Sequence, residues 1–147
     1  MPGFHLTEEI PRLPLEVFEF IAELGNIPKW HSVVTGVSIE GKGPVKTGMM
    51  FSERRLIRGE EGSVDNEVVL YEPPHTFATG FSGRGFRVIY KYTVRSQGTG
   101  SIVDLEVSIK GDGIKTLVTF IIARSMKGQD RDLLKRLKAA MHDQKGE

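Results

Sequence analysis

Apolar and polar residues alternate along most of the chain, which is the pattern of strands that bury one face. The clearest case spans residues 86–95, where Phe86, Val88, Tyr90, Tyr92 and Val94 alternate with polar residues. Only Ile89 breaks the alternation, because it is apolar at a polar position. Similar patterns predict further strands at residues 4–10, 33–40, 49–57, 64–71, 75–82 and 102–109. Turns rich in Gly or Pro separate the last six strands at short intervals, which favours an antiparallel meander.

Two other segments have the period of a helix. Residues 15–24 follow Pro14, which suits a first helical turn, and they end before Gly25 and Asn26. Residues 114–143 contain no proline and carry one apolar stripe, formed by Val118, Ile122, Met126, Leu133, Leu137 and Ala140. The sequence therefore predicts a short helix after the first strand and a long helix at the C-terminal end.

The long helix has two unlike halves. Residues 117–123 are apolar on nearly every side, whereas residues 127–143 are amphipathic and highly charged. An apolar segment of this kind must be covered on more than one side. The mixed charges of the second half indicate a solvated face. Gly128 lies between the halves and costs about 1 kcal/mol relative to Ala in a helix, so we expect a kink or a break there.

The order of these elements indicates one α+β domain that spans residues 1–147. It is a strand, a helix, a short turn, six strands and a long helix. The only large element able to cover one face of the sheet is the C-terminal helix. A curved antiparallel sheet of about seven strands that wraps around this helix leaves space between the two. Such a space, lined by aromatic and aliphatic side chains, is a site for an apolar ligand.

Composition narrows the function classes. Twenty Lys and Arg against nineteen Asp and Glu give a formal net charge of +1, which argues against nucleic-acid binding. The chain contains no cysteine, so disulfides, thiolate catalysis and Cys-based metal sites are excluded. Its four histidines show no metal-ligand spacing, and no P-loop, dinucleotide or serine-hydrolase motif is present. We therefore expect no metal and no cofactor.

The sequence shows neither a signal peptide nor a membrane-spanning stretch. Residues 1–10 do not read as a signal peptide. No stretch approaches the roughly 18 consecutive apolar residues of a membrane span. We expect a cytoplasmic protein without a membrane span.

Several short strings resemble one superfamily in their order and spacing. They are LEVFEFI at 15–21, NIPKWH at 26–31, GMMF at 48–51, EVVLYEPP at 67–74 and DLLKRLK at 132–138. Together they resemble the SRPBCC superfamily, which contains START-related and polyketide-cyclase-like proteins. The resemblance implies the helix-grip fold, with one or two short helices after the first strand, and an internal hydrophobic cavity. It implies no particular function, because lipid carriers, aromatases, cyclases and hormone receptors share this shape.

Aromatic residues are the candidate ligand-binding group. In this fold the concave face of the sheet is both core and cavity wall, so the predicted set consists of Trp30, Phe51, Phe77, Phe81, Phe86, Tyr90, Tyr92 and Phe120. Trp30 is either a wall near the cavity mouth or a core anchor between helix and sheet. The two tyrosine hydroxyls orient a ligand hydroxyl or carbonyl, bond a backbone group or reach the rim of the cavity.

Four residues are candidate catalytic groups, namely Tyr90, Tyr92, Glu8 and His31. Glu8 has the parity of an apolar strand face, although a wet strand end is the favoured interpretation. His31 follows Trp30 and is a candidate base near the cavity mouth. For this residue too, an exposed loop position is favoured.

Arg54 and Arg55 are neighbours on one predicted strand, so they face opposite sides of the sheet. One of them is placed to enter the cavity and hold a carboxylate or phenolate. The favoured interpretation is instead a surface ion pair with Glu53 or Glu67, since opposite charges commonly pair on antiparallel strands.

These observations leave two main hypotheses. The first is a module that binds a small hydrophobic or amphipathic molecule, such as a lipid, isoprenoid or polyketide-like compound. The second is a polyketide cyclase, aromatase or dehydratase that uses the same cavity with one or two polar groups. A second copy of the chain is a candidate partner through residues 117–123.

Overall fold

The alternating segments pair into one seven-stranded antiparallel sheet in the computed structural model, which describes residues 3–57, 59–83 and 85–145. The strands are β1 (Gly3–Ile10), β2 (Val34–Ile39), β3 (Met50–Ile57), β4 (Glu60–Glu72), β5 (Thr76–Gly83), β6 (Phe86–Gln97) and β7 (Gly100–Gly111). Their order in the sheet is β1-β7-β6-β5-β4-β3-β2. The predicted meander is thereby confirmed, and β1 pairs with β7 at one edge of the sheet.

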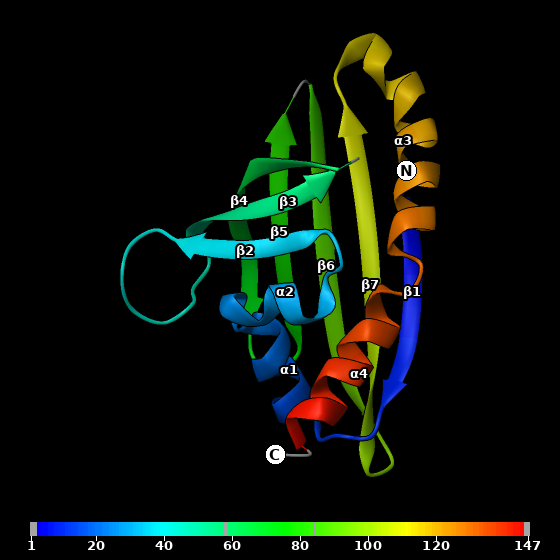
Figure 1. The fold of residues 1–147 in the computed structure, drawn as a ribbon. Coiled ribbons are helices and arrows are strands. Elements are labelled where there is room, and N and C mark those ends of the chain that lie inside the picture. The colour runs from blue at the N-terminus through cyan, green and yellow to red at the C-terminus, as the bar shows by residue number, and fades with distance from the viewer. Residues whose placement is uncertain (1–2, 58, 84, 146–147) are drawn as a thin grey trace.

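Helices lie on one face of this sheet (Figure 1). After β1 come α1 (Pro14–Ala22), a 3-10 turn (Leu24–Asn26) and α2 (Ile27–Trp30). After β7, a 3-10 turn (Gly113–Lys115) leads to α3 (Thr116–Asp130) and then to α4 (Leu133–Lys145). This arrangement confirms the α+β class and the helix-grip architecture predicted from the sequence.

The C-terminal helical segment changes direction between α3 and α4 (Figure 1). Gly128 lies inside α3, and the turn falls at Arg131 and Asp132. The expected interruption therefore exists, but three residues later than the glycine, because an exposed helical glycine costs only about 1 kcal/mol and is tolerated. The turn allows Asp130 at the end of α3 and Leu133 at the start of α4 both to reach the interior.

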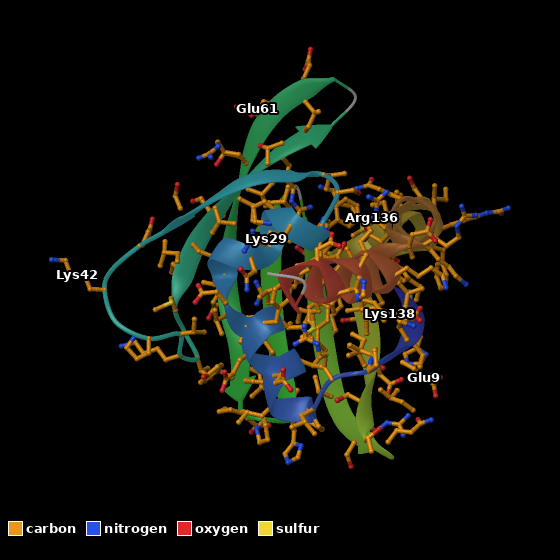
Figure 2. The ribbon with its side chains drawn as sticks, turned by 60° about the horizontal axis from the view of Figure 1, so that its bottom comes forward. Glu9, Lys29, Lys42, Glu61, Arg136 and Lys138 are labelled. Atoms are coloured by element: carbon orange, nitrogen blue, oxygen red, sulfur yellow. The ribbon has the colours of Figure 1, made fainter. Side chains whose placement is uncertain are left out.

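The core lies between the sheet and the helices. On β6 and β7 the predicted alternation holds, and it buries Val88, Tyr90, Tyr92, Val94, Val103, Leu105, Val107 and Ile109. From the other side, α1 and α4 contribute their buried apolar side chains, which include Val17, Phe18, Ile21, Leu134 and Leu137. Charged side chains such as Lys42, Glu61 and Arg136 lie on the outside (Figure 2).

The apolar half of the C-terminal segment is covered on one side only. Thr119 and Ala123 of α3 are buried, whereas Val118, Phe120 and Ile121 are 42%, 62% and 70% exposed. The expectation of cover on several sides is therefore wrong within this chain, because α3 runs along β7 and β1 at the sheet edge (Figure 1). The side chain of Leu117 lies outside the described residues. A homodimer through this segment stays a prediction.

Of the helices in the described part of the chain, none is long and apolar enough to span a membrane.

Removing apolar side chains from α4 and α3 tests this packing. Leu137 is fully buried, so Leu137→Ala should lower the free energy of unfolding by about 2–5 kcal/mol. Ile121→Ala removes a comparable side chain from an exposed position and should change the free energy of unfolding by less than about 0.5 kcal/mol. Urea denaturation measures both, and equal losses in the two variants would contradict the placement of the helices.

Candidate functional site

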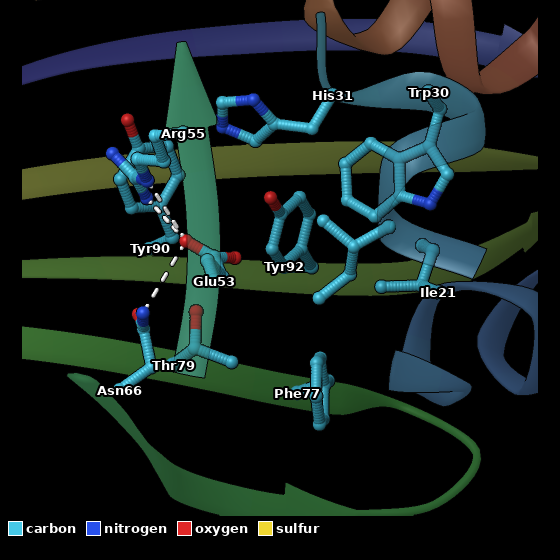
Figure 3. A pocket seen from close by; sticks show the side chains of 11 residues that line it. Ile21, Trp30, His31, Glu53, Arg55, Asn66, Phe77, Thr79, Tyr90 and Tyr92 are labelled. Carbon is cyan, nitrogen blue, oxygen red and sulfur yellow. Dashed lines mark hydrogen bonds and ion pairs between the residues drawn. The ribbon is translucent and has the colours of Figure 1, made fainter. Parts of the chain in front are cut away.

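A small pocket lies between the concave face of the sheet and the first helices (Figure 3). Strands β3–β6 provide seven lining residues, namely Glu53, Arg55, Asn66, Phe77, Thr79, Tyr90 and Tyr92. The helical side provides the other four, which are Ile21, Ile27, Trp30 and His31. The cavity volume is about 20 Å³, which is enough for one or two water molecules.

The lining of this pocket has two unlike ends (Figure 3). Ile21 and Phe77 lie toward the side where the Trp30 ring stands, and they make an apolar end. Charged and hydrogen-bonding side chains gather at the other end, where Glu53 and Arg55 face the chamber. The pocket thus offers apolar contact on one side and polar contact on the other.

A buried ion pair organises the polar end. Glu53 and Arg55 are two positions apart on β3, so their side chains share one face of the sheet. The Nε and Nη2 atoms of Arg55 donate to Glu53 Oε1 at 2.9 and 2.6 Å, and Asn66 Nδ2 donates to the same oxygen at 3.2 Å. The guanidinium also lies 4.8 Å from the centre of the Phe81 ring. All three polar partners are buried.

The predicted ion pair with Glu53 is confirmed for Arg55, but the expected surface position is wrong. Arg55 enters the interior, and its pair with Glu53 is buried, whereas Arg54 faces outward. Phe51, Glu53 and Arg55 share one parity, so the buried phenylalanine carries both charged residues to the concave face.

His31 contributes two polar atoms that have no hydrogen-bond partner in the part of the chain that the structure describes. It directly follows α2, and its backbone N–H donates to the Ile27 carbonyl at 2.8 Å. The side chain is buried, and neither Nδ1 nor Nε2 has a hydrogen-bond partner among the described residues. Burial lowers the pKa of His31 to about 3, with smaller contributions from the charges of Arg55 and Arg136. The expected exposed loop position is wrong, and the imidazole is neutral at physiological pH.

A hydrogen bond ties the sheet to the end of α3. The Tyr90 hydroxyl donates to Asp130 Oδ2 at 2.5 Å, and both side chains are buried. Burial, followed by the nearby Asp130 carboxylate, raises the pKa of Tyr90 well above its usual value. Burial also raises the pKa of Asp130, against the opposing effects of the Tyr90 bond and Arg55. The predicted solvated face of this charged segment does not include Asp130.

The aromatic rings pack closely around the pocket. Trp30 meets Tyr92 edge to face with ring centres 5.6 Å apart, and the His31 ring lies 6.1 Å from that of Tyr90. The Tyr92 hydroxyl points toward the polar chamber (Figure 3). Burial raises the pKa of Tyr92 well above its usual value, so this phenol is a hydrogen-bond donor at neutral pH.

Five predicted site residues line the pocket together, namely Trp30, Phe77, His31, Tyr90 and Tyr92. The other predicted residues lie elsewhere. Phe51 is buried in the core, while Phe81 and Phe86 are half-buried beneath the cationic ends of Arg55 and Lys115. Phe120 is exposed on the outer side of α3.

Glu8 also lies outside the pocket. Its carboxylate is half-buried and forms ion pairs with Lys135 at 3.3 Å and Lys138 at 3.7 Å. The parity of β1 does direct Glu8 toward the helix-covered side, but the two lysines of α4 meet it there.

The pattern of the sequence missed six lining or supporting residues, which are Ile21, Ile27, Glu53, Asn66, Thr79 and Asp130. Strand parity alone was enough to find Glu53. Asp130 had no such signal, because its burial depends on the turn between α3 and α4.

Comparison with known proteins identifies the family. The family model described as polyketide cyclase/dehydrase and lipid transport matches residues 1–142. The chain belongs to this family. Two uncharacterized proteins of Mycobacterium tuberculosis, MT1597 and Rv1546, are each 24% identical over 137 residues, covering 92% of this chain and 96% of theirs. The predicted relation to the SRPBCC superfamily is confirmed.

Solved structures share the fold at low sequence identity. TTHA0849 from Thermus thermophilus superposes with a TM-score of 0.74 at 15% identity, over 95% of this chain and 96% of that one. A START superfamily protein from Mycobacterium smegmatis gives 0.68 at 16% identity, over 95% and 97% of the two chains. The di-domain ARO/CYC protein BexL gives 0.77 at 17% identity, over 97% of this chain and 47% of its own.

The buried neutral histidine makes stability depend on pH. In the unfolded chain His31 binds a proton below about pH 6.5, whereas in the folded chain it stays neutral down to about pH 3. Stability therefore increases with pH across this window, and His31 should lower the free energy of unfolding by about 2 kcal/mol between pH 7 and pH 5. His31→Gln should remove this loss, as measured by urea denaturation at both pH values.

His75→Gln is the matched control, since it changes an exposed histidine and should keep the pH dependence of the parent chain. A His31→Gln variant with the parent's full pH dependence would show that His31 is not buried in its neutral form.

Proposed function

We propose that this chain binds a small amphipathic molecule in the pocket between β3–β6 and the helices α1 and α2. The apolar body of the ligand lies against Ile21, Phe77 and Trp30, and its polar end lies among His31 and the residues beside it. Family membership supports a hydrophobic-ligand-binding domain of the START and polyketide-cyclase type.

The unpartnered imidazole of His31 carries the proposal. Buried polar atoms nearly always have a hydrogen-bond partner, and leaving one unmade costs about 1–3 kcal/mol. Both ring nitrogens of His31 are buried at this pocket without such a partner among the described residues. A ligand oxygen at the polar end of the pocket supplies what the protein itself does not.

The ligand is larger than the present cavity. A volume of about 20 Å³ holds water, whereas drug-sized ligands occupy pockets of roughly 300–1,000 Å³. Binding of a lipid, isoprenoid or polyketide-like molecule thus requires the walls to move apart. The charged and hydrogen-bonded groups at the polar end are already oriented before this movement.

A second candidate function is a cyclase-, aromatase- or dehydratase-like enzyme that uses the same pocket. The convergence of His31, Tyr90 and Tyr92 on one volume favours it, because the Tyr92 hydroxyl there can donate to a developing enolate, whereas the Tyr90 proton is already donated to Asp130. A histidine whose pKa is about 3 is a weak base near neutral pH. This property ranks ligand binding ahead of proton abstraction by His31.

Trp30 allows a direct binding test, because it is the only tryptophan of the chain and lines the pocket. Titration with an aliphatic alcohol, a ketone, a fatty acid and a sterol should give a saturable change in Trp30 fluorescence for at least one of them. The same ligand should raise the melting temperature, since it binds the folded state.

The matched variants for this test are on β5. Thr79→Phe places a ring in the pocket and should weaken binding at least about tenfold, because it fills space that the ligand needs. Thr76→Phe adds the same ring on the opposite face of β5 and should bind normally. If no ligand changes either the fluorescence or the melting temperature, the proposed function is wrong.

A further inference from the structure

At the polar end of the pocket, two carboxylates surround one cationic side chain in the described part of the chain. Arg55 is the one cationic side chain that lines it among the described residues, and two of its nitrogens are bonded to Glu53. Asp130 brings a second carboxylate close by, and this group accepts the Tyr90 hydroxyl. With His31 neutral, the polar end holds one positive charge against one carboxylate that lines the pocket and another directly behind it.

A ligand carboxylate would be unfavourable in this place. The ligand carboxylate would be a third acidic group around a single guanidinium, which already donates two hydrogen bonds to Glu53. Burying an unpaired anion costs several kcal/mol, far more than burying an uncharged oxygen that finds a hydrogen bond. Arg136 adds positive charge from α4, but its side chain is exposed (Figure 2), so water and salt screen it.

An uncharged oxygen, in contrast, fits the free groups of the pocket. A neutral imidazole has one N–H donor and one acceptor nitrogen. In His31 both positions are buried and have no partner among the described residues. The Tyr92 hydroxyl points toward the same chamber (Figure 3). A ligand hydroxyl can donate to one of these groups and accept from another, and a carbonyl oxygen can accept from either donor.

We propose that the polar end of the ligand is an uncharged hydroxyl or carbonyl group bound by His31, and that the Glu53–Arg55 pair makes the pocket select against carboxylates. This inference rests on the proposed function and narrows its ligand class. It separates alcohols, phenols and ketones from free fatty acids, although both groups carry the same apolar body. Glu53 acts here as a specificity-determining residue through the charge it cancels.

The test compares 1-decanol, 2-decanone and decanoate, which share a ten-carbon chain and differ at the polar end. At pH 7.5 the carboxyl group of decanoate is ionised. Titrations followed by Trp30 fluorescence and by calorimetry should show that the alcohol or the ketone binds at least about tenfold more tightly than decanoate. Decanoate binding as tightly as both neutral ligands, or more tightly, would overturn the inference while leaving the proposed function intact.

Glu53→Gln supplies the decisive variant. It keeps the shape and an acceptor oxygen for Arg55 and Asn66, but it removes the carboxylate that is bonded to the guanidinium, so one acidic group fewer surrounds that positive charge. Decanoate should then gain about tenfold in affinity relative to 1-decanol. Glu60→Gln removes the same charge from an exposed position on β4 and should leave the ratio unchanged. Melting curves of both variants establish that they are folded.

The possible results bear differently on the selectivity inference and on the proposed function. An unchanged ratio in folded Glu53→Gln would overturn the role of Glu53 in selection. Binding of none of the three probes to the parent chain would contradict the inference and count against the proposed function itself for aliphatic ligands.

Discussion

The pair of Arg55 with Glu53 is the interaction around which the interior is arranged. A guanidinium in an interior is tolerated only when its charge is met and its donors are used. Glu53 meets the charge from the same strand, and Asn66 of β4 donates a further hydrogen bond to the same carboxylate oxygen. The charge of Arg55 also contributes to the low pKa of His31, after the larger effect of burial. Each of Glu53, Arg55 and Asn66 would destabilise the fold if it were buried alone. Together, at one end of the pocket, they satisfy one another's charges and hydrogen bonds.

The helices close the pocket against the concave face of the sheet. Tyr90 of β6 reaches Asp130 at the end of α3, so the C-terminal segment is bonded to the sheet beside the pocket. The turn that follows directs α4 across the first helices and buries Leu133 and Leu137. Trp30 and His31, next to each other in sequence, then face the strands from the opposite side. The fold therefore surrounds one pocket, with a polar end at Glu53 and Arg55 and an apolar end at Ile21 and Phe77 (Figure 3).

The type and order of the strands and helices could be predicted from the sequence, because they depend on the hydrophobic periodicity within each segment. Alternation on β6 and β7 and helical spacing in residues 15–24 arise from the geometry of a single segment. The site was less readable, since burial of His31, Arg55 and Asp130 results from contacts between distant segments. Typical exposure of these residue types led to the wrong prediction for each of them. The exposed Phe120 shows the converse, because it lies on the outer side of α3, where no described residue buries it.

The state of the His31 ring tests this description of the site. Nitrogen NMR of the labelled protein distinguishes a neutral imidazole from a charged one and identifies which nitrogen carries the proton. We expect His31 to remain neutral from pH 7 down to pH 5 and its nitrogen signals to move when 1-decanol is added. A His31 signal that titrates near its ordinary pKa of 6.5 and ignores the alcohol would contradict both the buried polar chamber and its role in binding.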